Sequence, residues 1–200
     1  GAWVARSSAR SGRVTAGPPS VVSHGLYERL AQFASTRRAD AGPSDPGLQA
    51  EAERVLYHEA RLLDDRHYRT WLDRFTDDCI YWIPLDLEGD PRQQVSFFLD
   101  DRRRMDDRIG LLETGWMHAQ NPHSRTCRVV SNVEAWPMEN GDTLARCTVV
   151  TWEYRRDRLT PFVSRNDYEL AAMGDEWRIR TKIVGLVDSV GDVRKFAFIL

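Results

Sequence analysis

Hydrophobic positions divide the chain into a helical first part and a strand-rich second part. Between residues 22 and 63 many apolar side chains recur at intervals of three or four, the spacing of one face of an α-helix. This spacing predicts a short amphipathic helix over 22–33 and a longer helix over 52–63. Residues 37–47, which contain two prolines and two glycines, are expected to link them.

A third helix, two short strands and a fourth helix are expected next. Four residues share one helical face: Tyr68, Trp71, Leu72 and Phe75. Asp65 precedes them and has a side chain that favours the N-cap position. The apolar segments 79–84 and 95–99 favour strands because they are rich in β-branched and aromatic side chains. Residues 100–113 return to helical spacing, and one of the first two, both Asp, can cap that helix.

From residue 126 onward apolar and polar positions alternate, which indicates strands. Turn-forming residues interrupt the alternation at 139–142, at 155–161 and at 173–176, and the first of these contains an Asn-Gly pair that favours a hairpin. The last residues, KFAFIL, are expected to form a further strand or an apolar tail docked on the core. Helices followed by an antiparallel meander predict an α+β fold, in which a curved antiparallel sheet wraps on the N-terminal helices.

Composition and charge narrow the class of protein. The 200 residues carry a formal net charge of −2, which gives no reason to expect a nucleic-acid partner. No apolar run suits a transmembrane helix or a signal peptide, so we expect a cytoplasmic protein without membrane contact. We expect residues 1–47 to be a tail and linker, partly disordered with one short helix, and residues 48–200 to form the main domain.

Metal-binding signatures are absent from the sequence. The three cysteines are widely spaced and form no CxxC or CxH pair: Cys79, Cys127 and Cys147. Each lies in a strand-like segment, so we expect three small buried apolar side chains. His118 and His123 form an H-x4-H pair, but Glu113 is the only acid close before them. We therefore expect no metal or cofactor in this chain.

Residues 57–84 mix acids, a histidine and tyrosines, which raises the question of acid–base catalysis. An isomerase or dehydratase can use a carboxylate or His in an apolar pocket, with a Tyr as hydrogen-bond donor. Four residues would form such a set: Asp65, His67, Tyr57 and Tyr81. A structural interpretation competes with this one, because capping explains Asp65 and because His67 lies beside the apolar stripe rather than on it.

Four sequence blocks follow one another in a recognisable order. The first is YHEARLLDDRHYRTWLDRFTDDCIYWIP (57–84), and the second is FFLDDRRRMDDRIGLLETG (97–115). The third is NPHSRTCRVVSNVEAW (121–136), and the fourth is EWRIRTKIVGLVDS (176–189), followed by FAFIL. Together these blocks resemble the small (β) subunits of aromatic-ring-hydroxylating dioxygenases over about residues 50–200.

The resemblance implies a cone-shaped α+β domain of the nuclear transport factor 2-like or cystatin-like type. It also implies a large α subunit that carries a Rieske [2Fe–2S] cluster and a mononuclear non-haem iron. That subunit dihydroxylates an arene with O2 and electrons from NAD(P)H. The assembly is commonly α3β3 with a β trimer. Because this sequence lacks the C-x-H and C-x-x-H pairs of a Rieske site, the resemblance implies a non-catalytic, structural role for this chain.

Five residues are candidates for contacts between subunits: Arg125, Asn132, Trp82, Trp116 and Trp136. Arg125 can make charge-assisted pairs across a subunit boundary, and tryptophans can serve as aromatic anchors. Ordinary core packing would explain the tryptophans equally well.

Overall fold

The computed structural model describes residues 24–37, 42–114, 123–174, 176–189 and 198–200. The helices in these ranges are α1 (His24–Thr36), α2 (Pro46–Asp64), α3 (Tyr68–Leu72) and α4 (Arg102–Glu113). The strands are β1 (Phe75–Pro84), β2 (Ser96–Asp101), β3 (Arg125–Pro137), β4 (Thr143–Arg155), β5 (Arg158–Met173) and β6 (Glu176–Leu186). The predicted order is confirmed: three helices, two short strands, a fourth helix and then the longer strands.

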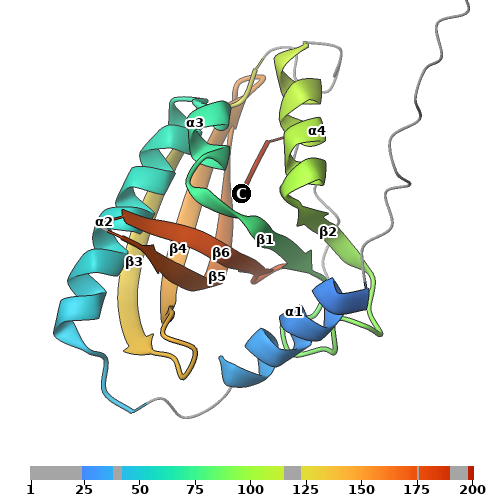
Figure 1. The fold of residues 1–200 in the computed structure, drawn as a ribbon. Coiled ribbons are helices and arrows are strands. Elements are labelled where there is room, and N and C mark those ends of the chain that lie inside the picture. The colour runs from blue at the N-terminus through green and yellow to red at the C-terminus, as the bar shows by residue number, and fades with distance from the viewer. Residues whose placement is uncertain (1–23, 38–41, 115–122, 175, 190–197) are drawn as a thin grey trace, which may run out of the picture.

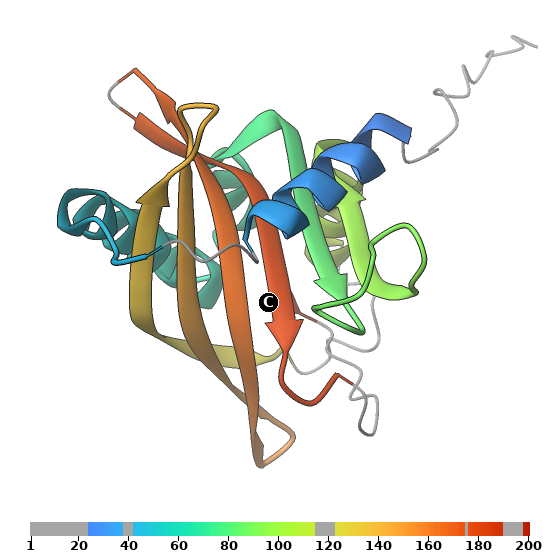
Figure 2. The ribbon, with the colours of Figure 1, turned by 90° about the horizontal axis from the view of Figure 1, so that it is seen from below.

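The six strands form one curved, unclosed sheet in the order β2-β1-β6-β5-β4-β3. Neighbouring strands are antiparallel except for β1 and β6, which run parallel. Figure 1 shows α2 lying along the inner face of the sheet, with α3 and α4 near one end. Figure 2 shows α1 crossing the opposite, outer face. The α+β class predicted from the sequence is therefore confirmed.

Two hydrophobic cores lie on the two faces of the sheet. Tyr81 and Ile83 of β1 belong to the inner core with α2, whereas Ile80 and Trp82 belong to the outer core with α1. Both faces of β1 are buried from residue 79 to residue 84, and its sequence there is a continuous apolar run rather than an alternating one. Three side chains of α1 fill the outer core: Leu26, Leu30 and Phe33.

A polar contact fastens the end of α1 to the sheet. Arg37, directly after the helix, lies 3.3 Å from the Asp167 carboxylate of β5, and both side chains are buried. The helix predicted over 22–33 thus exists, and it packs on the sheet although it falls in the region expected to be tail and linker.

The prediction that all three cysteines are buried is wrong for Cys127, which is exposed. The register between β3 and β4 shifts between Ser131 and Glu134, and Asn132 in this bulge has a φ of 53°. One extra residue in a strand exchanges its two faces. Val133 beyond the bulge is buried, whereas Cys127 before it faces outward.

Two local predictions for the region around α3 are also wrong. Asp65 is the C-cap of α2, and its backbone N–H donates to Arg61 and Leu63, whereas His67 holds the N-cap position of α3 without a side-chain hydrogen bond. Phe75 is not helical, because it pairs with Ile179 of β6 and begins β1. For Phe75, pairing with a distant strand outweighs the local spacing that predicted a longer helix.

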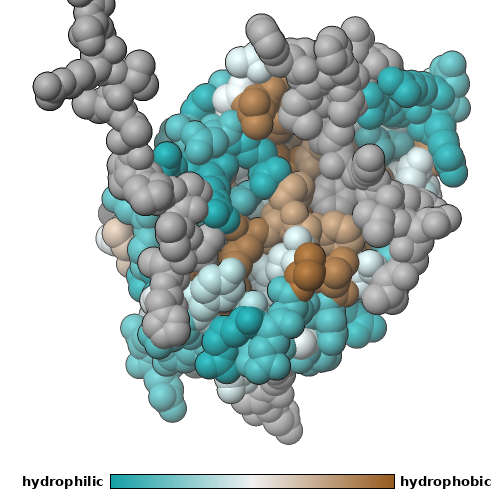
Figure 3. Space-filling view, turned by 90° about the vertical axis from the view of Figure 1, so that its right-hand side faces the viewer, coloured by the Kyte–Doolittle hydropathy of each residue, from teal (hydrophilic) through white to brown (hydrophobic). Residues whose placement is uncertain are grey.

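Face-on to β2 and α4, the surface is a mosaic of apolar and hydrophilic side chains (Figure 3). Exposed apolar residues of this region include Val95, just before β2, and Leu111 of α4.

The predicted cap of α4 is confirmed, since the Asp101 side chain accepts a hydrogen bond from the backbone N–H of Arg104.

We predict that Asp45→Ala lowers the free energy of unfolding by about 1 kcal/mol, the usual cost of losing an N-cap. The Asp45 Oδ1 accepts from the backbone N–H groups of Gly47 at 2.8 Å and Leu48 at 2.9 Å at the start of α2. Urea denaturation followed by circular dichroism measures the change. Asp65→Ala is the matched control, because Asp65 is exposed, and an equal or larger loss in that variant would contradict the assignment of the caps.

Candidate functional site

A buried ion pair lies inside the cone formed by the sheet and α2. The Nζ of Lys182 on β6 lies 2.8 Å from the Oε1 of Glu59 on α2, and the side chains are 2% and 4% exposed. Glu59 reaches this position because it shares the inward face of α2 with Leu56 and Leu63. Lys182 points inward because its neighbour along the strand, Ile183, packs in the outer core.

The remaining hydrogen-bonding capacity of the Glu59 carboxylate is used by two aromatic side chains. The indole N–H of Trp71 in α3 donates to Oε1 at 2.9 Å, and the Tyr168 hydroxyl of β5 donates to Oε2 at 2.9 Å. Three donors from three elements therefore surround one carboxylate. A buried charge is tolerated when it is paired and hydrogen-bonded in this way.

Lys182 joins this cluster to the last residues of the chain. Its Nζ also donates to the main-chain oxygen of Leu200 at 2.9 Å, and the Tyr81 hydroxyl donates to the same oxygen at 2.9 Å. Arg128 of β3 donates to the main-chain oxygen of Ile199 and forms an ion pair with Asp64. Of the two possibilities expected for the end of the sequence, a further strand or a docked apolar tail, residues 198–200 show the docked tail, since they are buried in the inner core.

Side chains and the tail leave little open space in the cone. The cavity between α2 and the inner faces of β3 to β6 has a volume of about 10 Å³, which is at most enough for a single water molecule. Glu59, Tyr168, Lys182 and Leu200 are among the residues that line it. An organic substrate does not fit into this space.

Burial determines the protonation of the groups around the ion pair. It raises the pKa of the Tyr81 and Tyr168 hydroxyls, so both remain hydrogen-bond donors at neutral pH. Burial also raises the pKa of the Cys147 thiol to about 12. Desolvation lowers the pKa of Lys182, and the Glu59 carboxylate opposes that shift. These three side chains therefore provide neither a reactive thiolate nor an ionised phenol at neutral pH.

The four residues proposed for acid–base catalysis are not brought together. Asp65 and His67 are exposed in the turn between α2 and α3, and Tyr57 of α2 is 39% exposed. Tyr81 is the only one of the four inside the cone, where it holds the tail. Glu59 and Lys182, which our sequence reasoning missed, occupy the interior instead.

The interface candidates fall into two groups. Trp82 is buried and donates to the Ser96 hydroxyl at 2.7 Å, and Trp136 is buried and donates to the Gly42 carbonyl at 3.0 Å. Arg125 and Asn132 are exposed on β3. Trp116 lies outside the described residues, as does His118, whereas His123 is exposed.

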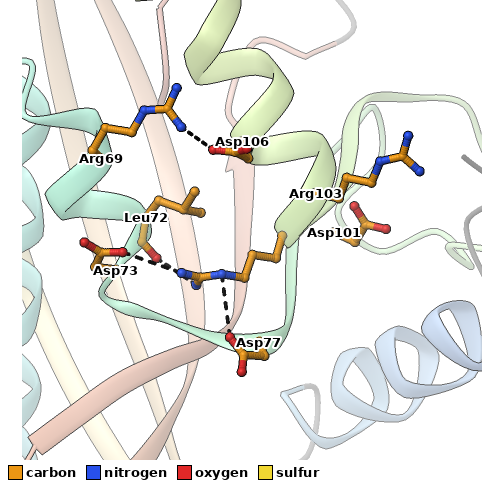
Figure 4. Close-up of a pocket in the computed structure, with 8 residues that line it drawn as sticks. Arg69, Leu72, Asp73, Asp77, Asp101, Arg103 and Asp106 are labelled. Carbon is orange, nitrogen blue, oxygen red and sulfur yellow. Dashed lines mark hydrogen bonds and ion pairs between the residues drawn. The ribbon is translucent and has the colours of Figure 1, made fainter. Parts of the chain in front are cut away.

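A groove of about 700 Å³ lies outside the cone, between α3 and α4 (Figure 4). Eight residues line it: Arg69, Leu72, Asp73, Asp77, Asp101, Arg102, Arg103 and Asp106. Arg69 forms ion pairs with Asp106 and with the nearby Glu113. Arg102 donates to the main-chain oxygens of Leu72 and Phe75, each at 3.0 Å. The groove is open and strongly charged, so it is better suited to contact with another protein than to binding a small apolar substrate.

Among the residues that the structure describes, no three His, Cys, Asp or Glu side chains gather into a possible metal site. Within the same residues no helix is long and apolar enough to cross a membrane.

Comparison with known proteins gives the family. The model of the ring hydroxylating beta subunit family matches residues 58–192. The chain belongs to this family. Over 137 residues it is 31% identical to the small oxygenase component of the p-cumate 2,3-dioxygenase system of Pseudomonas putida, covering 67% of this chain and 76% of that protein. It is also 31% identical over 137 residues to toluate 1,2-dioxygenase subunit beta of Pseudomonas putida, covering 66% and 85% of the two chains.

Solved structures agree with this β-subunit assignment. The β subunit of benzoate 1,2-dioxygenase from Burkholderia mallei superposes with a TM-score of 0.63 and 26% identity, over 79% of this chain and 99% of that one. An NTF2-like protein with a cystatin-like fold from Novosphingobium aromaticivorans gives a TM-score of 0.51 at 16% identity, over 82% and 88% of the chains, which shows the fold alone. The family and the fold type predicted from the sequence blocks are confirmed.

We predict that Glu59→Gln and Lys182→Met each lower the free energy of unfolding by about 3 to 5 kcal/mol, because each leaves the other group buried without its partner. The double variant should lose less than the sum of the two single losses, since the two residues form one pair. Chemical denaturation of the unmodified protein, the two single variants and the double variant gives the coupling free energy of the pair. The exposed pair of Arg54 and Glu51 is the control, where Arg54→Met should cost less than about 1 kcal/mol; additive losses at Glu59 and Lys182 would refute the coupling.

Another buried carboxylate, that of Glu169 on β5, predicts a pH dependence of stability. Its carboxylate accepts from the Thr181 hydroxyl at 2.7 Å and from the Asn140 amide at 3.1 Å, and burial raises its pKa. A raised pKa in the folded state means that the contribution to stability is present at low pH and is lost as the pH rises through that pKa.

Glu169→Gln cannot titrate, so the variant should gain stability relative to the unmodified protein as the pH rises above about 4, the usual pKa of a glutamic acid. Urea denaturation at several pH values measures this difference. The exposed Glu176 provides the control variant Glu176→Gln, which should follow the unmodified protein. A difference for Glu169→Gln that is flat or falls with pH would contradict the raised pKa.

Proposed function

We propose that this chain is the structural β subunit of a ring-hydroxylating dioxygenase and contributes no catalytic residue of its own. The filled interior of the cone carries this proposal. The Glu59–Lys182 pair and Leu200 occupy the place where a pocket enzyme of this shape would hold a substrate, and only about 10 Å³ remains. Family membership supports a role within an oxygenase rather than as an independent enzyme.

The two iron centres of such an oxygenase are assigned in this proposal to a partner α subunit. A Rieske cluster needs two cysteines and two histidines in fixed pairs. Burial raises the pKa of the Cys79 and Cys147 thiols to about 12, and Cys127 faces outward on β3. The described side chains therefore fit neither iron centre. When present in the α subunit, these centres would supply the chemistry that adds both atoms of O2 to an arene, with electrons from NAD(P)H.

The proposed assembly contains three α and three β subunits, with the β subunits forming a trimer. Two relatives are named as the small oxygenase component of a p-cumate dioxygenase system and as the beta subunit of toluate dioxygenase, and these names support a partner subunit and an aromatic substrate. The exposed positions of Arg125 and Asn132 on β3 make them available for contacts between subunits. Three free cysteines are consistent with a cytoplasmic location.

The alternative function, an independent isomerase or dehydratase, needs a pocket that unites Asp65, His67, Tyr57 and Tyr81. Three of these side chains face solvent and the fourth holds the tail. No observation on the described residues favours this alternative.

Co-expression with the α subunit encoded by the neighbouring gene tests the proposal. We expect a single hetero-oligomer in size-exclusion chromatography with light scattering, which contains iron and oxygenates an arene. Glu59→Gln should reduce the yield of this complex without changing the ratio of product to iron, because the residue stabilises the subunit and takes no part in the reaction. A chain that elutes alone beside a fully active α subunit would contradict the proposal.

Arg125→Ala identifies the part of the surface that assembly uses. The guanidinium of Arg125 lies 5.9 Å from the centre of the exposed Tyr154 ring. We expect the loss of this side chain to weaken assembly. The domain should stay folded, because Arg125 is exposed. Arg54→Ala on α2, where the side chain is 70% exposed, is the matched control. An unchanged sedimentation profile for Arg125→Ala would remove this residue from the interface.

A further inference from the structure

One part of the outer face of the sheet is apolar and exposed. Four large side chains of β3, β4 and β5 lie there: Val129, Trp152, Tyr154 and Leu159. Tyr154 of β4 pairs with Arg125 of β3 on one side and with Leu159 of β5 on the other. Cross-strand partners point to the same face, so these residues form one continuous surface. Exposed apolar surface of this kind commonly marks a protein contact.

This surface ends in a basic hairpin, which projects past the neighbouring strands in Figure 2. The turn between β4 and β5 consists of Arg156 and Asp157, both with positive φ, at 49° and 58°. Arg156 and the following Arg158 are exposed. Aromatic side chains next to arginines are the combination that is enriched at the centres of protein interfaces.

The groove between α3 and α4 presents carboxylates together with arginines, and two of its carboxylates are exposed and can meet a basic partner. Four aspartates and three arginines line its volume of about 700 Å³, and Asp73 and Asp77 are labelled among them in Figure 4. The Asp73 and Asp77 side chains are 76% and 100% exposed, and they lie 3.6 and 3.7 Å from Arg102.

These two ion pairs are long, and Arg102 is also engaged by the main-chain oxygens of Leu72 and Phe75. A carboxylate can accept a bidentate guanidinium in addition to a distant cation. Asp73 and Asp77 therefore retain the capacity to bind arginines from outside the chain.

We propose that the β4–β5 hairpin of one copy docks in the α3–α4 groove of a second copy, with Arg156 and Arg158 facing Asp73 and Asp77. A second copy is the occupant because the same chain carries both complementary surfaces. Since these surfaces differ, the contact is head-to-tail, and repetition of such a contact closes a ring or continues as a chain of subunits. The inference deepens the self-association in the proposed function and rests on it.

Charge reversal on the two surfaces tests the contact in the full chain. Arg156→Glu/Arg158→Glu and, separately, Asp73→Lys/Asp77→Lys should each weaken self-association at least about tenfold, the scale expected for lost charge pairs at an interface. A chain that carries all four substitutions should recover self-association, because its acidic hairpin then meets a basic groove. Analytical ultracentrifugation over a range of concentrations gives the association constants, and circular dichroism verifies that each variant is folded.

The control is Arg54→Glu/Arg61→Glu on the exposed side of α2, which makes the same change in net charge as the hairpin variant and should associate normally. Failure of the fourfold variant to recover, with both parent variants folded, would overturn the inference. So would an unmodified chain that is monomeric at every concentration. If that monomer still binds the α subunit, the proposed function stands and only the contact between copies fails. A hairpin variant that loses the α subunit but self-associates normally would assign the hairpin to the α contact instead.

Discussion

The ion pair between Glu59 and Lys182 is the interaction on which the interior of the molecule depends. Two charges removed from water are costly unless they are paired and their remaining hydrogen bonds are made. Here both conditions are met by residues from α2, α3, β5 and β6 together with the tail. Because each of these elements supplies one group of the cluster, hydrogen bonds and the ion pair fix the relative positions of the elements, in addition to apolar packing.

The same cluster explains why the cone is closed. A cone of this shape has an open end, and in this chain Phe198, Ile199 and Leu200 pack into the inner core. Lys182 and Tyr81 hold the main-chain oxygen of Leu200, and Arg128 holds that of Ile199. Glu59, Lys182 and Arg128, the charged side chains of this cluster, are therefore occupied by structural partners. The outer surface is therefore the part of the molecule that can contact other molecules, as expected of a subunit that acts in assembly.

The sequence predicted the elements that depend on local patterns. The helical spacing found α1, α2 and α4, and the turn residues at 139–142 and 173–176 marked two hairpins. Features that depend on how the strands pair with one another were not accessible in this way. The exposure of Cys127 follows from a bulge five residues away, and the end of α3 follows from the pairing of Phe75 with β6.

The candidate site was the hardest part to predict. Asp65 and His67 attracted attention because they stand in a conspicuous acidic stretch, yet both are exposed. Glu59 occupies an inward position of α2, and Lys182 is one of two lysines in a chain whose other 26 cations are arginines, out of 28 Lys and Arg in total. A lysine within an apolar strand and a glutamate on an apolar helix face were the available signals. Their pairing could not be inferred, because 123 positions separate them.

Hydrogen exchange of the Trp71 indole N–H, followed by NMR, tests the central claim most directly. This proton is donated to Glu59 inside the closed cone. If the ion pair and the tail seal the interior, the proton exchanges only when the whole domain unfolds, and its exchange free energy equals that of global unfolding. Exchange that is much faster than global unfolding would show that the cone opens to water in the folded state, and it would contradict the account of a closed, structural interior.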